Sequence, residues 1–202
     1  MERIKTLAKE GNALLDQNQF PQAETVYAEL LRLCEAQMDG VSADEASRFW
    51  CLACTGMGTI RSFAGDQEAA REWYGKAVPV CQRLAAGFRS AQAGRELSLT
   101  YGNLGDTYAA QRDFHNARIW YEKKWEIVQQ YLERFETEIT RYDLVMACCK
   151  LGYVSRGEEQ LGWYRKALEV LARLTDQHPD NARYVQLEKQ CRATVQMLEK
   201  GQ

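Results

Sequence analysis

The sequence predicts an all-α protein, a solenoid of about four antiparallel helix pairs followed by a C-terminal capping helix. Apolar residues recur at helical spacing, as Leu7, Leu14 and Leu15 show, whereas strand-like alternation is scarce. The chain has only three prolines, so long helices are rarely interrupted. Four glycines lie 47 residues apart, at Gly11, Gly58, Gly105 and Gly152.

The period of 47 residues recurs in two other residue types. It links Ala23, Ala70 and Ala117, and also Tyr27, Tyr74 and Tyr121. A fixed period of this length indicates stacked supersecondary units, each of which packs on its neighbours. We therefore expect a single repeat domain over 1–202, with units near 1–40, 41–88, 89–136 and 137–178 and a capping helix at 180–200.

Polar residues at regular positions predict where the helices begin. Asp66 and Asp113 are placed as N-caps, whose side-chain oxygens accept hydrogen bonds from free backbone N–H groups. Ser42 opens a Ser-x-x-Glu capping box, and Ser90 and Thr137 are its counterparts in later units. The predicted helices span 2–17, 20–38, 43–64, 67–86, 91–111, 114–135, 138–155, 158–176 and 181–200.

The fourth helix pair departs from the period. Gly152 and Tyr164 are separated by 12 residues, whereas Gly105 and Tyr121 are separated by 16. Terminal repeats of a solenoid are commonly irregular because one side of them faces solvent. We expect a shortened fourth pair, closed by the capping helix.

The third unit carries the residues of a known family signature. Tyr101-x2-Leu104-Gly105-x2-Tyr108, followed by Ala117-x3-Tyr121, resembles the tetratricopeptide repeat motif W-x2-L-G-x2-Y…A-x3-F, with Tyr101 in place of the tryptophan. The other units match in part, so the resemblance covers nearly the whole chain. The usual repeat is about 34 residues, and the longer period here resembles the long-repeat bacterial branch of the family. The resemblance implies a right-handed α-solenoid.

In the resembled family, the first helices of the units line a concave groove that holds an extended peptide or a helix. On a helical wheel, small and polar residues, including Ala8 and Gly102, form a stripe facing away from the predicted core. A solvated face without a partner would show the same pattern. The candidate partner-binding residues are Asn12, Asp16, Thr55, Thr59, Phe63, Asn103, Asp106, Tyr153 and Arg156.

One subtype of the family grips a C-terminal carboxylate with a Lys/Asn/Asn/Lys/Arg clamp. The corresponding positions in this chain are Ala8, Asn12, Gly56, Leu99 and Asn103, of which only Asn12 matches. Without the cations, little offsets the desolvation of a carboxylate. We therefore do not expect carboxylate binding at these positions.

Charge and hydropathy exclude several classes of partner. With 26 basic and 28 acidic residues, the chain has a net charge of −2 and no basic block, which argues against nucleic acid. No apolar run is long enough to span a membrane, and no signal peptide is visible, so we expect no membrane association. Seven cysteines, an odd number, are better explained as reduced thiols of a cytoplasmic protein.

Residues that could support catalysis do not form a known constellation. Cys51-x2-Cys54 lacks the remaining ligands and spacing of a zinc site, and His115 and His178 have no nucleophile partner at motif spacing. We expect no metal, no cofactor and no enzymatic activity.

The favoured function is a non-catalytic scaffold that binds another protein or a peptide in the groove. Two alternatives remain open at this point. The chain could be a regulatory module that senses a peptide or a metabolite, or a structural protein that self-associates through its ends.

Overall fold

The structure, a computed structural model, describes residues 1–40, 43–86 and 90–201. Within these ranges the chain forms nine α-helices and no strand, which confirms the all-α prediction. Each predicted helix begins and ends within three residues of an observed one. The helices are α1 (Glu2–Asp16), α2 (Phe20–Glu35), α3 (Ala43–Phe63), α4 (Gln67–Ala85), α5 (Ala91–Ala110), α6 (Phe114–Arg134), α7 (Glu138–Val154), α8 (Gly157–Gln177) and α9 (Ala182–Lys200).

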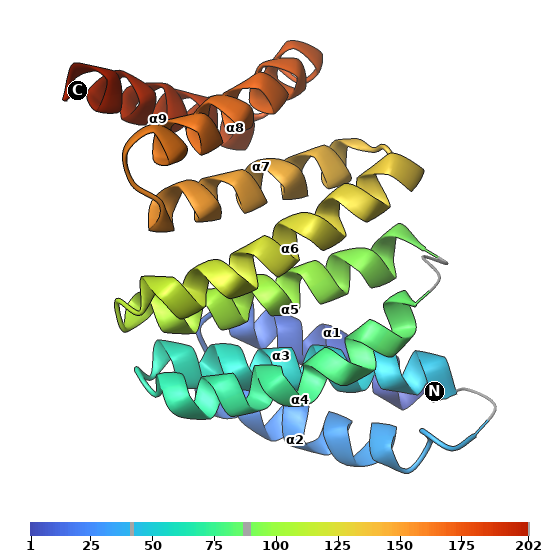
Figure 1. Cartoon of the computed structure of the whole chain (residues 1–202). Coiled ribbons are helices and arrows are strands. Elements are labelled where there is room, and N and C mark those ends of the chain that lie inside the picture. The colour runs from blue at the N-terminus through green and yellow to red at the C-terminus, as the bar shows by residue number, and fades with distance from the viewer. Residues whose placement is uncertain (41–42, 87–89, 202) are drawn as a thin grey trace.

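The helices stack as antiparallel pairs, so that each helix packs on the helices next to it in the chain (Figure 1). The odd-numbered helices α1, α3, α5 and α7 also contact one another from pair to pair. They therefore form one layer of the solenoid, and α2, α4, α6 and α8 form the other. The last helix, α9, packs on α8 and covers the end of the stack, as predicted.

The predicted N-caps are confirmed where the structure describes them. Asp66 and Asp113 accept hydrogen bonds from the backbone N–H three residues later, at 3.0 and 3.1 Å. Ser90 and Thr137 do the same, each at 3.2 Å. The capping box expected at Ser42 lies outside the described residues. These caps satisfy N–H groups that have no partner inside the helix.

The turn inside each of the first three pairs has one residue in the left-handed region. Asn18, Gly65 and Arg112, again 47 residues apart, have φ values of 58°, 83° and 60°. In each turn the next residue donates its N–H to the carbonyl five positions earlier, at 2.8, 3.0 and 3.0 Å. This is the bond of a Schellman C-cap, for which glycine is the preferred residue. Arg112 is therefore the strained member of the three.

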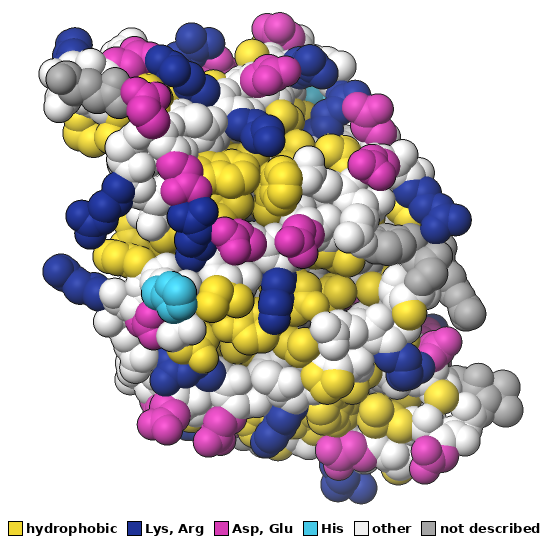
Figure 2. Space-filling model, viewed as in Figure 1, with side chains coloured by type: hydrophobic (Ala, Val, Ile, Leu, Met, Phe, Trp, Pro, Cys, Tyr) yellow, Lys and Arg dark blue, Asp and Glu magenta, His cyan; other side chains and the backbone are white. Residues whose placement is uncertain are grey.

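Hydrophobic side chains on the face seen in Figure 2 form patches among charged groups of both signs. Part of the exposed apolar surface of the chain belongs to tryptophans that directly precede the repeat tyrosines. Trp73 and Trp120 are half-buried, and the ammonium groups of Lys76 and Lys123 lie 4.1 and 4.2 Å from their ring centroids. Cation–π contacts of this kind shield an aromatic face while the charge stays in water.

Each helix pair closes around a tyrosine that rests on a glycine. A Cβ added to Gly11, Gly58 or Gly105 would lie 2.6, 2.6 or 2.3 Å from a ring carbon of the tyrosine 16 residues later. These rings are buried. The two helices approach this closely only because the glycine has no side chain.

The fourth pair reaches the same contact by a shorter path. A Cβ on Gly152 would lie 2.8 Å from the ring of Tyr164. Helix α7 ends two residues after its glycine whereas α5 ends five after, and the turn at 155–156 is one residue shorter than that at 111–113. Together these changes account for the tyrosine standing four residues, or about one helical turn, earlier.

Replacing Gly105 by alanine tests the glycine–tyrosine contact. Overpacking against the buried ring costs about 1–3 kcal/mol, which outweighs the gain of about 1 kcal/mol in helix propensity. Gly75→Ala is the matched control, because a Cβ there meets nothing within 4 Å. Urea unfolding should show Gly105→Ala destabilised and Gly75→Ala stabilised by about 0.5–1 kcal/mol; equal effects would contradict the contact.

Replacing Arg112 by glycine should stabilise the fold. Glycine adopts positive φ without the Cβ clash, so we expect a gain of about 1 kcal/mol and a rise in Tm of about 2–4 °C. Arg112→Ala keeps the strained backbone and should show no such gain. A calorimetric Tm that is unchanged in Arg112→Gly would disprove the strain.

Candidate binding groove

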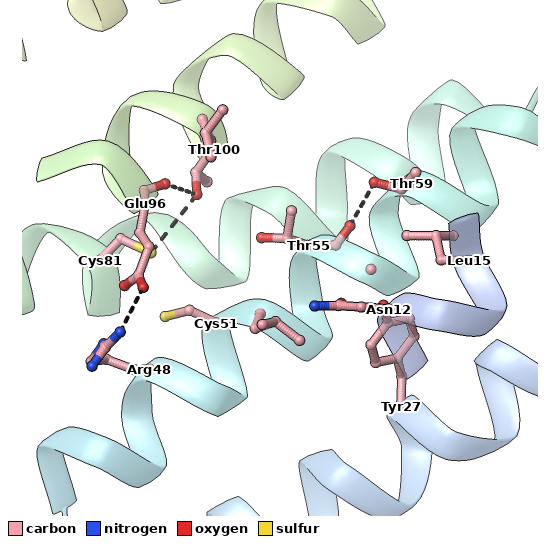
Figure 3. Close-up of a pocket in the computed structure, with 13 residues that line it drawn as sticks. Asn12, Leu15, Tyr27, Arg48, Cys51, Thr55, Thr59, Cys81, Glu96 and Thr100 are labelled. Carbon is pink, nitrogen blue, oxygen red and sulfur yellow. Dashed lines mark hydrogen bonds and ion pairs between the residues drawn. The ribbon is translucent and has the colours of Figure 1, made fainter. Parts of the chain in front are cut away.

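The odd-numbered helices bear a row of three adjoining cavities, which we call the groove. The first cavity lies where α1, α3 and α5 meet and has a volume of about 190 Å³. Figure 3 shows its polar side chains from all three helices directed toward a common space. Its lining residues are Asn12, Leu15, Tyr27, Arg48, Cys51, Leu52, Thr55, Gly56, Thr59, Cys81, Glu96, Leu99 and Thr100.

The other two cavities continue this row along α5 and α7. Thr59 belongs to both the first and the second cavity, and Asp106 belongs to both the second and the third. The second cavity is lined by Thr59, Ser62, Phe63, Tyr74, Asn103 and Asp106. The third is lined by Asp106, Ala109, Ala110, Tyr121, Cys149, Lys150 and Tyr153. The cavities therefore form a continuous surface across all four helix pairs.

The repeat tyrosines reach through to this surface. The hydroxyl of Tyr27 donates to Oδ1 of Asn12 at 2.8 Å, and the hydroxyl of Tyr121 donates to Oδ1 of Asp106 at 2.6 Å. In the second pair, the hydroxyls of Thr59 and Tyr74 lie 3.1 Å apart. Burial raises the pKa of Tyr27 and of Tyr74 to about 12, so both hydroxyls stay protonated. The residue after each of the first three repeat glycines is thus held in position by the phenol of a buried tyrosine.

Ion pairs link successive helices along the groove with the same 47-residue period. Arg48 of α3 binds Glu96 of α5 at 3.1 Å, and Arg95 of α5 binds Asp143 of α7 at 3.0 Å. The second carboxylate oxygen of Glu96, Oε2, is buried and has no hydrogen-bond partner among the described residues. A buried acceptor of this kind is costly unless a donor reaches it.

The structure brings together most of the residues predicted from the sequence. Asn12, Thr55 and Thr59 line the first cavity, and Phe63, Asn103 and Asp106 line the second. Tyr153 lines the third cavity. Its ring makes an edge contact with the ring of Phe114, with the two centroids 5.8 Å apart. These seven residues share one surface. The helical wheel predicts this for six of them, whereas Asn103 was a candidate because of its clamp position.

The remaining predicted residues lie outside these cavities. Asp16 and Arg156 are exposed at helix ends and line none of these three cavities. Ala8 and Gly102, which the wheel placed on the open stripe, are buried. A Cβ added to Gly102 would lie 3.3 Å from the side chain of Lys124 on α6. The side-chain oxygen of Asn12 accepts a hydrogen bond from Tyr27.

Known proteins resemble this chain in one repeat and in overall fold. Residues 99–123, which hold the signature of the third pair, match the model of the tetratricopeptide repeat family. Residues 99–123 therefore form a tetratricopeptide (TPR) repeat, and the chain as a whole is a helical repeat solenoid of TPR-like fold. No curated protein matches its sequence.

Solved structures with a similar fold cover almost the whole TPR chain. BtubC (BKLC) from P. vanneervenii has a TM-score of 0.63 and 13% identity, over 98% of this chain and 80% of that one. The apo form of RapI has a TM-score of 0.61 and 14% identity, over 98% and 70%. A putative kinesin light chain from Podosopora anserina with nearly identical TPR-like repeats has a TM-score of 0.50 and 14% identity, over 98% and 92%. At these identities the likeness shows the fold alone.

The described part of the TPR chain offers little for other chemistry. No three His, Cys, Asp or Glu side chains in it are grouped to hold a metal ion. Cys54 of the Cys-x2-Cys motif is buried, and this burial raises the pKa of its thiol to about 12. None of the described helices is long and apolar enough to cross a membrane.

Several groove residues were missed by the sequence analysis. Arg48, Leu52, Glu96 and Leu99 line the first cavity although none was a candidate. The stripe was followed for only about one turn on either side of the glycine. Arg48 stands ten residues before Gly58. Leu52 and Leu99 stand six residues before Gly58 and Gly105. At about 100° per residue, these offsets place all three side chains on the stripe. Extending the wheel along the whole helix would have found Arg48, Leu52 and Leu99, but not Glu96, which lies about 180° from Gly105.

A fourth cavity adjoins the groove between α5, α7 and the start of α9. It shares Leu99 with the first cavity and Lys150 with the third. Its lining residues are Arg95, Leu99, Lys124, Ile139, Tyr142, Asp143, Met146, Lys150, Asn181, Arg183 and Tyr184. Lys124 lies on α6 and is only 2% exposed, so it is the unusual member of this set.

Lys124 occupies a position that is apolar in every other helix pair. It stands three residues after the repeat tyrosine, where the other pairs have Leu30, Ala77 and Ala167, all fully buried. Its ammonium donates to the carbonyl of Ser98 at 3.4 Å. Burial lowers the pKa of Lys124 to about 8, because an ammonium is poorly solvated in the protein interior.

Replacing Lys124 by methionine should therefore stabilise the protein at neutral pH. The lowered pKa corresponds to a cost on the order of 3 kcal/mol, so we expect a gain of about 1–3 kcal/mol. Because the folded pKa lies below the unfolded value of 10.5, wild-type stability relative to Lys124→Met should rise with pH between about 8 and 10.5. Urea unfolding across this range measures both effects, with exposed Lys123→Met as control; a destabilised Lys124→Met at neutral pH would contradict them.

Proposed function

We propose that this TPR protein is a non-catalytic scaffold that binds a segment of another protein, or a peptide, in the groove. The observation that supports this best is the continuity of the three cavities across all four helix pairs. A continuous open surface of this length suits an extended segment or a helix better than a compact metabolite. TPR proteins are in general non-catalytic scaffolds, in agreement with this proposal.

The composition of the groove fits a polypeptide ligand. Leu15, Leu52 and Leu99 supply an apolar surface in the first cavity, and Leu99 is 41% exposed. Asn12 is an exposed residue, and Glu96 Oε2 lacks a donor among the described residues. A peptide backbone offers both the N–H group that Glu96 lacks and the carbonyl that the amide of Asn12 can bind.

The charges of the groove favour protein over nucleic acid. Arg48, Arg95 and Lys150 are each paired with a carboxylate of the chain. A run of free cations, which a phosphate backbone requires, is not formed by these residues. We propose the cytoplasm as the compartment, on the ground that seven cysteines stand at helical packing positions.

Replacing Leu99 by glutamate tests the groove. A charge in the middle of its apolar surface should weaken partner binding at least about tenfold, because the carboxylate would have to be desolvated. Ile119→Glu is the matched control, since Ile119 lies on α6, outside the groove cavities, and is 39% exposed. Both variants should keep the helical circular dichroism of the wild type.

The measurement is affinity capture from a native extract with mass spectrometry, followed by calorimetric titration of the captured partner. We expect a stoichiometric partner that binds wild type and Ile119→Glu and is lost in Leu99→Glu. Equal binding of the two variants would overturn the groove assignment. Capture of the chain by itself alone would favour self-association instead.

A further inference from the structure

The fourth cavity contains more positive charge than its own carboxylate can balance. Four cations line it, from Arg95, Lys124, Lys150 and Arg183, and Asp143 is the one carboxylate in the lining. The volume of this cavity is about 310 Å³. The question is which of these cations remain available to a ligand.

Two of the four cations are already paired. Arg95 binds Oδ2 of Asp143, and the hydroxyl of Tyr131 donates to the same oxygen at 2.9 Å. Lys150 binds Asp106, which belongs to the groove, at 2.5 Å. Within each pair the two charges neutralise each other, and the bond holds both side chains in place.

The other two cations have no ion-pair partner in the part of the chain that the structure describes. The ammonium of Lys124 has only the carbonyl of Ser98, at 3.4 Å, although it has three N–H bonds to donate. The guanidinium of Arg183 lies over the ring of Tyr142, 4.7 Å from its centroid. The carboxylates of Asp143 and Asp106 favour the charged form of Lys124, but each is paired with another cation, so the buried ammonium remains costly. The other helix pairs avoid this cost with alanine or leucine.

The rim of the fourth cavity is apolar. Leu99 and Ile139 are 41% and 53% exposed, and Met146 lies beside them in the lining. Because Leu99 also belongs to the first cavity, a segment in the groove can extend into the fourth. An occupant that fits has one anionic group next to an apolar side chain.

We propose that the fourth cavity is a carboxylate-binding subsite of the groove, in which Lys124 and Arg183 hold an acidic group of the bound polypeptide. The inference rests on the proposed function, since it supplies the chemistry of the same ligand. It differs from the clamp of the TPR subtype, whose positions in this chain are Ala8, Asn12, Gly56, Leu99 and Asn103 and contribute no cation. Here the buried cation comes from α6 instead.

The stability of the protein gives this proposal an internal check. A bound carboxylate supplies the counterion that Lys124 lacks, so it favours the charged ammonium and raises the lowered pKa. If Lys124 only fills space, Lys124→Met should raise the stability of the protein and leave ligand affinity unchanged. If Lys124 binds the ligand, the Lys124→Met variant should be more stable but should no longer bind the acidic ligand.

The experiment is a titration of the full chain with blocked dipeptides, followed by NMR of the Lys124 side chain. Acetyl-Leu-Glu-amide carries a side-chain carboxylate, acetyl-Leu-Leu with a free C-terminus carries a main-chain carboxylate, and acetyl-Leu-Gln-amide is the neutral match. We expect at least one acidic peptide to bind about tenfold or more tightly than the neutral one, as loss of a charge-assisted bond predicts. The stronger of the two acidic peptides identifies the source of the carboxylate.

Variants separate a binding role from a structural one. Lys124→Met and Arg183→Gln should each weaken the acidic peptide, while Lys123→Met, the neighbouring lysine on α6, should not. The proposal is overturned if the neutral peptide binds equally well, if Lys124→Met retains the affinity, or if inorganic phosphate competes more strongly than either acidic peptide.

The two proposals can fail independently. Leu52 lines the first cavity but not the fourth, so Leu52→Glu should leave dipeptide binding unchanged while it weakens a captured partner. A partner that depends on Leu52 but not on Lys124 would overturn the subsite and leave the scaffold intact. Dipeptide binding at Lys124, with no partner that depends on Leu52, would overturn the scaffold and leave the subsite.

Discussion

The contact between a buried tyrosine ring and a glycine without Cβ determines the architecture of this protein. In each pair the distance from the glycine to the ring leaves no room for a methyl group. The contact therefore sets how closely the two helices approach. It also brings the hydroxyls of Tyr27, Tyr74 and Tyr121 to the residue that follows the glycine. The tyrosines that pack the helices therefore also position side chains of the groove. The fourth pair shortens a helix end and a turn yet keeps this contact.

The repeats act as internal controls for one another. Where all pairs agree, as at the glycine and tyrosine, the residue serves packing. Where one pair has a different kind of residue at a buried position, packing alone does not explain that residue. Lys124 is such a position, because three equivalent sites show that an apolar side chain fits. Its retention at a cost in stability is what would be expected at a functional site.

The first and the fourth cavity differ in their charge balance. Arg48 with Glu96 and Arg95 with Asp143 repeat the same link between successive odd-numbered helices, and leave the first cavity nearly neutral. The unpaired cations gather beyond Leu99, in the fourth cavity. A ligand with an apolar segment and one acidic group matches this sequence of environments.

The helices and their pairing could be predicted from the sequence, because the caps, the glycine and the tyrosine act within one pair and recur at intervals of 47 residues. It also placed Asn12, Thr59 and Asp106 on one surface, since that requires only the wheel of a single helix. The burial of Ala8, the pairing of Arg48 with Glu96 and the cavity that α9 closes around Lys124 appear only in the folded protein. These outcomes depend on how one pair stacks on the next, which is set by side-chain packing between helices far apart in the chain rather than by any local pattern.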